Sequence, residues 1–204
     1  MTEPHTVPSS LTLMPAIWAR MRLGAHIHSG DGELFFAIKA DPDAYTKAFA
    51  VFGYSLIEHP SKFFYLDGPD KDIGEAVRIA EILAVAFVLI DLSAGDGLGF
   101  EQAFFPNPPS SRRLGDLNLF QQQQHREVLA AAQIADNDGV TRALRTMNRL
   151  GFARFDPTSE SVTFLPPFHR LRDLCLALAD RGEANVATLA KDNIEKLTDP
   201  DVTA

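Results

Sequence analysis

The chain has 204 residues, of which 46% are hydrophobic and 23% are charged, and its formal net charge is -8. These fractions are typical of an ordinary soluble globular protein, and the length suits one compact domain or two small ones. The single cysteine, Cys175, excludes an internal disulfide and fits a reducing cytoplasm, and the N-terminal residues lack the basic and apolar regions of a signal peptide.

The first predicted unit begins with a helix over residues 11–23 that stops at Gly24. A short extended segment and a second helix over residues 32–40 follow. Asp41 or Asp43 then caps a third helix, since a carboxylate can accept the unpaired N–H groups of a first turn. That helix stops at Gly53 and leads into two strands joined by a turn at residues 60–61.

The next stretch is a strongly apolar helix over residues 70–93. Its longest apolar run, residues 79–92, is too short to cross a bilayer, so we expect no membrane span. A helix this apolar must be covered on all sides, either by threading between two units or by forming a subunit interface. Residues 94–111 are rich in Gly, Pro and Ser and are the best linker candidate, although their three phenylalanines suggest that part of the segment docks.

The second predicted unit repeats the pattern of the first. Helical material at residues 114–135 precedes a break at residues 136–138, a third helix from Val140 to Gly151, and two strands joined by a turn at residues 156–159. Another helix is expected over residues 167–179, and a last amphipathic helix over residues 185–197.

A helix that feeds a two-stranded hairpin is half of a winged-helix unit, and each copy has helical material upstream for the other half. We therefore predict a mainly α fold with small β-hairpins and tandem winged-helix domains. The expected limits are 11–68 for the first winged-helix unit, 69–111 for the apolar helix and linker, 112–182 for the second unit, and 183–204 for the C-terminal helix and tail.

The charges are distributed unevenly along the chain. Residues 1–111 hold 7 basic and 14 acidic side chains, whereas residues 112–172 hold 9 basic and 6 acidic ones. All nine are arginines: Arg112, Arg113, Arg126, Arg142, Arg145, Arg149, Arg154, Arg170 and Arg172. Arginine binds phosphate and base edges in a bidentate manner, so an acidic protein can still present one basic face. Pairing of these arginines with acidic side chains of the same helices is an equally good interpretation.

The third helix of the second unit is the predicted DNA-binding element. Val140, Leu144, Met147 and Leu150 form one apolar stripe, and Arg142, Arg145 and Arg149 fall on the other side. Together with Arg154 on the following strand, these arginines are the candidate DNA-binding residues. The corresponding helix of the first unit carries only Lys47.

Other chemistry finds little support in the sequence. The chain has no nucleotide-binding P-loop, no zinc-protease motif, no CxxC and no serine-hydrolase elbow. The glycines at 95, 97 and 99 are read as a flexible loop, and His26 and His28 with Asp31 lack a convincing third metal ligand. We therefore expect no catalytic residue, no cofactor and no metal.

The arrangement resembles the kite subunits of bacterial condensins, the MksE and MukE group. The resemblance rests on the first helix ending at Gly24, on residues 45–66 and on residues 140–173, and it covers roughly residues 11–180. It implies a cytoplasmic, nucleoid-associated homodimer that binds a kleisin subunit and, through the kleisin, an SMC ATPase, and that contacts double-stranded DNA without sequence preference. It further implies a role in chromosome organisation and segregation or in plasmid defence.

Two other functions remain open on the sequence. A stand-alone winged-helix transcription regulator would bind a near-palindromic site with half-sites about one helical turn apart. A purely structural adaptor would not contact DNA. The acidic first unit and the apolar helix favour protein contacts, so any DNA contact belongs mainly to the second unit.

Overall fold

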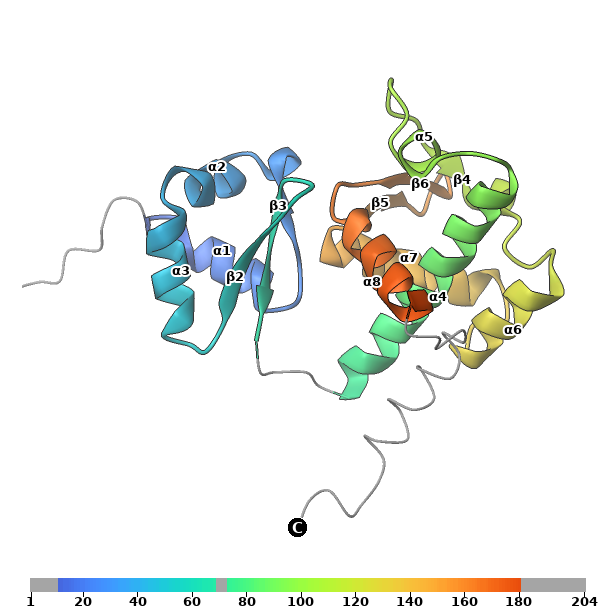
Figure 1. Cartoon of the computed structure of the whole chain (residues 1–204), viewed down its shortest axis with the longest axis horizontal. Helices are drawn as coiled ribbons and strands as arrows, with labels where there is room; N and C mark the ends of the chain where they lie inside the picture. The colour runs from blue at the N-terminus through green and yellow to red at the C-terminus, as the bar shows by residue number, and fades with distance from the viewer. Residues whose placement is uncertain (1–10, 69–72, 181–204) are drawn as a thin grey trace, which may run out of the picture. The chain divides into compact units, whose positions relative to one another are not determined.

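The computed structural model describes residues 11–68 and 73–180 (Figure 1). Contacts divide the chain into two compact units, Met1–Asp70 and Lys71–Ala204. Each unit holds helices and one small antiparallel sheet of three strands. The predicted fold class, mainly α with tandem winged-helix units, is confirmed.

The first unit follows the winged-helix order. Its elements are α1 (Met14–Met21), β1 (Ile27–His28), the 3₁₀ turn η2 (Ser29–Asp31), α2 (Glu33–Ala40), α3 (Pro42–Ala50), β2 (Ser55–His59) and β3 (Phe63–Asp67). β3 lies between β1 and β2. Asp41 caps α3 by accepting a hydrogen bond from the Ala44 backbone at 3.2 Å, as predicted. Gly53 has a φ of 79°, a left-handed conformation that glycine adopts without strain.

The core of the first unit is rich in aromatic side chains. Tyr45 and Phe49 of α3 are fully buried with Ile17 of α1 and Phe64 of β3. Trp18 packs against this cluster, with its ring centroid 6.0 Å from that of Phe49. These aromatic residues form a core, but Phe36 and Phe52, which their spacing also predicts to be core residues, are 62% and 57% exposed.

The second unit contains α4 (Ile73–Gly95), α5 (Phe100–Phe104), β4 (Arg112–Arg113), the 3₁₀ turn η3 (Leu114–Leu117), α6 (Gln123–Ala131), α7 (Asn137–Leu150), β5 (Ala153–Asp156), β6 (Ser161–Phe164) and α8 (Phe168–Asp180). β6 lies between β4 and β5. α8 confirms the helix expected near residue 167. The helix expected over residues 185–197 lies outside the described residues.

The apolar helix α4 is the centre of the second unit. α5, α6, α7 and α8 all contact it (Figure 1). Val85, Val88 and Leu89 are buried in the core that it shares with them. Of the two expectations for this helix, threading between the units is wrong, because α4 belongs to the second unit, and a subunit interface stays a prediction. The physical reason is that the later helices fold back around α4 and cover its apolar surface.

The segment expected to act as a linker is partly structured. Phe104 of α5 is buried, with its ring centroid 4.9 Å from that of Phe168, and Phe100 and Phe105 pack against the same core. The expected docking of these phenylalanines is confirmed. The domain limits at 69 and 112 stay a prediction.

Asp91, a charged residue of α4, has a partner in another helix of the unit. Asp91 Oδ2 lies 2.8 Å from Nε2 of His125 in α6, and the His125 ring is fully buried. This contact joins α6 to α4, in addition to the buried Val128 and Leu129 of α6.

None of the described helices is long and apolar enough to cross a membrane.

Substituting Leu89 with alanine is expected to lower the free energy of unfolding of the second unit by about 2–5 kcal/mol, because the side chain is 2% exposed and its removal leaves a cavity. Leu176→Ala is the control, since Leu176 in the same unit is 55% exposed and its loss changes stability by less than about 0.5 kcal/mol. Chemical denaturation followed by circular dichroism measures both. A loss below 1 kcal/mol for Leu89→Ala would contradict a central position of α4.

Candidate nucleic-acid interface

The helix α7 has the two faces that the sequence predicted. The Asp136 side chain caps its first turn by accepting from the Gly139 backbone at 3.0 Å, and Gly151 ends it with a φ of 80°. The apolar stripe is buried throughout: Val140, Leu144, Met147 and Leu150. The opposite face, with its arginines, is therefore turned to solvent.

Arg142 has a partner on another helix. Its Nε donates to Oε1 of Glu81 at 2.9 Å, and its Nη2 lies 2.8 Å from the same oxygen. The Glu81 side chain is only 7% exposed, whereas the Arg142 side chain is 57% exposed. Arg142 thus neutralises a buried carboxylate of α4, and part of its guanidinium group remains accessible from outside.

Arg145, Arg149 and Arg154 differ from Arg142. All three are exposed, and none forms an ion pair with a carboxylate in the part of the chain that the structure describes. The sequence also allowed these arginines to pair with acidic residues of their own helices. Among the described residues, these three arginines do not form such pairs.

A hydrogen bond brings the end of α7 and the strand β5 together. Asn148 Oδ1 accepts from the Phe155 backbone N–H at 3.2 Å, on the side of β5 that faces away from β6. Arg149 follows Asn148 directly, and Arg154 precedes Phe155. Arg145, Arg149 and Arg154 therefore lie around the point where the end of α7 meets β5. We call these three residues the arginine surface.

The charge along α7 changes from one end to the other. Asp138 is exposed in the first turn, where a carboxylate favours the positive end of the helix dipole, and Arg149 is in the last turn, where a cation favours the negative end. The free cations therefore gather over the C-terminal half of α7 and the start of β5. Such a surface fits a polyanion such as a nucleic-acid backbone.

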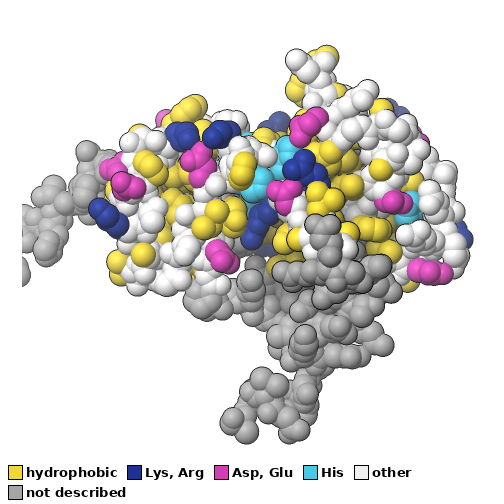
Figure 2. All heavy atoms as spheres, in the orientation of Figure 1, with side chains coloured by type: hydrophobic (Ala, Val, Ile, Leu, Met, Phe, Trp, Pro, Cys, Tyr) yellow, Lys and Arg dark blue, Asp and Glu magenta, His cyan; other side chains and the backbone are white. Residues whose placement is uncertain are grey.

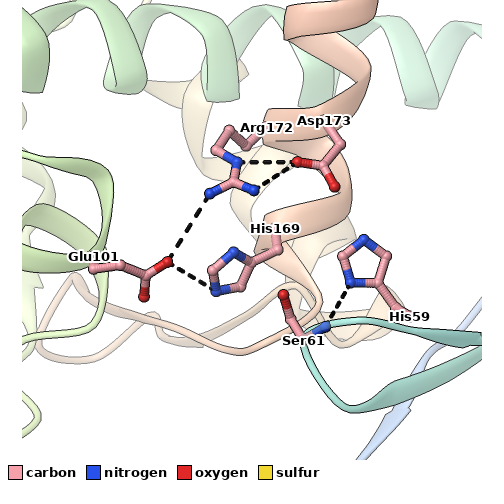
Figure 3. A network of polar contacts seen from close by, with 6 residues as sticks. All are labelled: His59, Ser61, Glu101, His169, Arg172 and Asp173. Atoms are coloured by element: carbon pink, nitrogen blue, oxygen red, sulfur yellow. Dashed lines mark hydrogen bonds and ion pairs between the residues drawn. The ribbon is translucent and has the colours of Figure 1, made fainter.

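Two other arginines of the same block have partners within the second unit. Arg172 of α8 bonds Asp173, lies 3.9 Å from Glu101 Oε1, and stands 4.8 Å over the ring of Phe100 (Figure 3). His169 Nε2 lies 3.6 Å from the same Glu101 oxygen. Arg126 donates to the Phe120 and Gln121 carbonyls and to Gln123, and so holds the start of α6.

Residues considered for a metal have a structural role in the first unit. The His28 backbone N–H donates to Asp31 Oδ2 at 2.8 Å, and the His28 ring accepts from the Gly30 N–H at 3.0 Å. Asp31 also pairs with Arg20 of α1 at 2.6 Å. The His59 ring likewise accepts from the Ser61 N–H at 3.1 Å and closes the β2–β3 turn (Figure 3). Across the described ranges, no group of three His, Cys, Asp or Glu side chains is arranged to hold a metal ion.

The one cysteine is not a nucleophile in the folded chain. Burial raises the pKa of the Cys175 thiol to about 12, so it stays protonated in the physiological range.

Comparison with protein families identifies the chain. The model of the family described as condensin complex protein MksE matches residues 12–176, which is most of the sequence. The chain belongs to the MksE family. No curated protein matches it in sequence.

Membership in the MksE family settles several expectations of the sequence analysis. The family consists of non-catalytic condensin subunits, which agrees with the missing catalytic motifs. The partners of an MksE chain lie within the SMC complex. The arginine surface is a candidate site.

The first unit has a different surface from the arginine surface. Its third helix, α3, carries Lys47 alone as a basic residue, and Val51 and Phe52 at its end are 80% and 57% exposed. Apolar atoms are visible on this unit in Figure 2. Sequence reasoning did not identify these exposed residues, because periodicity assigns aromatic residues to the core.

Replacing Arg142 with alanine is expected to lower the free energy of unfolding by about 1–3 kcal/mol, because Glu81 then stays buried without its partner. Arg145→Ala, on the same helix face, is the matched control and changes stability by less than about 0.5 kcal/mol. Thermal and chemical unfolding measure both variants. Equal losses in the two variants would show that the Glu81 contact contributes nothing to the fold.

Proposed function

We propose that this MksE-family chain is the kite subunit of a bacterial condensin-like SMC complex, that it forms a homodimer and binds the kleisin, and that it contacts double-stranded DNA through the arginine surface. Its SMC ATPase partner is reached through the kleisin, and the complex serves chromosome organisation and segregation or plasmid defence at the nucleoid. Family membership supports the complex, and the arginine surface supports the DNA contact.

One observation carries the DNA contact. Arg145, Arg149 and Arg154 gather around the Asn148–Phe155 hydrogen bond, exposed and without a carboxylate partner among the described residues. Holding three like charges together costs free energy unless an anion compensates them. A DNA backbone supplies such anions, and guanidinium groups bind phosphate in a bidentate manner.

The position of the arginines favours contacts to phosphates over reading of bases. In helix-turn-helix proteins the N-terminal residues of the recognition helix contact base edges. In α7 that end carries Asp138, and Arg142 is held by Glu81. We therefore expect binding that depends strongly on salt and little on sequence.

The first unit is the better candidate for protein contacts. Val51 and Phe52 expose apolar area at the end of α3, and Trp18 packs on Phe52 with ring centroids 5.0 Å apart. Aromatic residues with a rigid support are common at the centre of protein interfaces. This surface is our candidate for self-association of two chains.

A stand-alone transcription regulator is the second candidate function. The exposed outer face of α7 favours it, because a recognition helix needs such a face. It requires sequence-specific binding to a near-palindromic site, with affinity orders of magnitude above that for random DNA. Asp138 at the N-terminal end of α7 disfavours this function, because that end of a recognition helix contacts the bases.

The double substitution Arg145→Glu with Arg149→Glu is expected to weaken binding to random-sequence duplex DNA at least about tenfold. It should also reduce the slope of log affinity against log salt by about 2, since two phosphate contacts are lost. Fluorescence anisotropy over a series of salt concentrations measures both, and circular dichroism checks the fold.

The control for this experiment is Arg22→Glu with Lys47→Glu, which makes the same change in net charge on exposed residues of the first unit. It should leave the affinity within about twofold. If the two double variants lose affinity equally, the effect is one of total charge and the arginine surface is not the DNA site. Strong preference of the wild-type chain for one sequence would favour the regulator.

A further inference from the structure

The adjacent arginines of β4 have opposite environments. Arg112 points to the inner side of the sheet, where its guanidinium group donates to the Ala103 carbonyl and stands 5.6 Å over the Phe104 ring. Arg113 is exposed and forms no ion pair with a carboxylate of the described segments. Side chains alternate along a strand, so one arginine of the pair supports the core while the next one faces solvent.

The pairing register places Arg113 on the same sheet face as Arg154. Arg113 lies opposite Ser161 of β6, and Arg154 lies opposite Thr163, two residues further along the same strand. Opposite residues of an antiparallel pair share a face, as do residues two apart. The solvent face of the sheet thus has one arginine on each outer strand and the Thr163 hydroxyl beside Arg154, while Ser161, opposite Arg113, has its hydroxyl 2.9 Å from that of Ser159 and faces Asp156 on β5.

This face continues from the arginine surface. Arg154 belongs to both, because β5 is the edge strand that Asn148 of α7 bonds. β4 and β5 are two strand spacings apart, about 10 Å. Arginine side chains and serine and threonine hydroxyls are the groups that commonly bind DNA phosphates.

The turn between β5 and β6 has the opposite charge. Asp156 lies across Ser161 on the same face, and its carboxylate accepts from the Thr158 N–H at 2.9 Å and from the Ser159 hydroxyl at 2.6 Å. The Ser159 hydroxyl, followed by the Thr158 N–H, lowers the pKa of Asp156, so the carboxylate stays ionised. Glu160 is exposed in the same turn. The end of the hairpin therefore repels phosphate.

We propose that the DNA path of the second unit extends from the arginine surface across the solvent face of the β4–β6–β5 sheet to Arg113, and that the acidic turn limits it. The partner is the phosphate backbone of duplex DNA. The inference rests on the proposed DNA contact of α7 and adds Arg113 and Thr163 to it. It also excludes the tip of the hairpin, which carries Asp156 and Glu160.

The test uses the full chain and a random-sequence duplex over a range of salt concentrations. Arg113→Gln is expected to weaken binding about 3–10-fold and to reduce the salt slope by about 1, the effect of one lost phosphate contact. Arg113→Lys should retain most of the affinity. Arg22→Gln, on an exposed residue of the first unit, is the control and should change neither quantity.

A variant of opposite sign sharpens the test. Asp156→Asn keeps the shape and the acceptor for Thr158 but removes the negative charge from the face, so it should strengthen DNA binding about 2–5-fold. Unfolding measurements on Arg113→Gln and Asp156→Asn check that both variants fold as the wild type does.

The outcomes separate this inference from the proposed function. If Arg145→Glu with Arg149→Glu loses DNA binding while Arg113→Gln and Asp156→Asn change nothing, the extension is wrong and the α7 contact stands. If none of these variants changes binding, both are wrong. A loss of kleisin binding with unchanged DNA binding in Arg113→Gln would make the sheet face a protein contact and overturn the inference.

Discussion

The ion pair between Glu81 of α4 and Arg142 of α7 is the contact on which the second unit depends. A buried carboxylate without a partner is costly, so the apolar helix α4 can be enclosed only if a cation reaches Glu81. Arg142 supplies it from the face that also carries Arg145 and Arg149. The pair therefore fixes the rotation of α7 about its own axis, with the apolar stripe against α4 and the arginines outward. The contact of Asp91 with His125 joins α6 to the same helix.

The arginine surface follows from that orientation. Once α7 is set, Asn148 meets the free edge of β5 and brings Arg154 beside the end of the helix. The sheet then extends the surface through the register of β5, β6 and β4. A single unit thus carries the whole proposed DNA surface, while the first unit, with Val51 and Phe52 exposed, offers apolar area for protein contacts. This division agrees with the uneven distribution of charge along the sequence.

Local features were predictable from the sequence, and contacts between distant segments were not. The Asp41 cap, the stop at Gly151 and the stripe from Val140 to Leu150 depend on neighbours within a few residues, and the structure confirms them. The Glu81–Arg142 pair joins residues 61 positions apart, so no periodicity indicates it. For the same reason the sequence did not place α4 inside the second unit, since its coverage there depends on four later helices. Arg112 and Arg113 look alike in sequence, and only the pairing of the short strand β4 separates their roles.

Membership in the MksE family and the absence of a catalytic role make kleisin binding the central claim of this account. The most direct test is light scattering on the purified wild-type chain, alone and mixed with a kleisin subunit from the same genome. The mass of one chain is 22.4 kDa, and we expect the chain alone to form a particle of twice that mass. With the kleisin added, we expect a stable complex that contains both proteins. A monomer that elutes separately from the kleisin at micromolar concentration would contradict it.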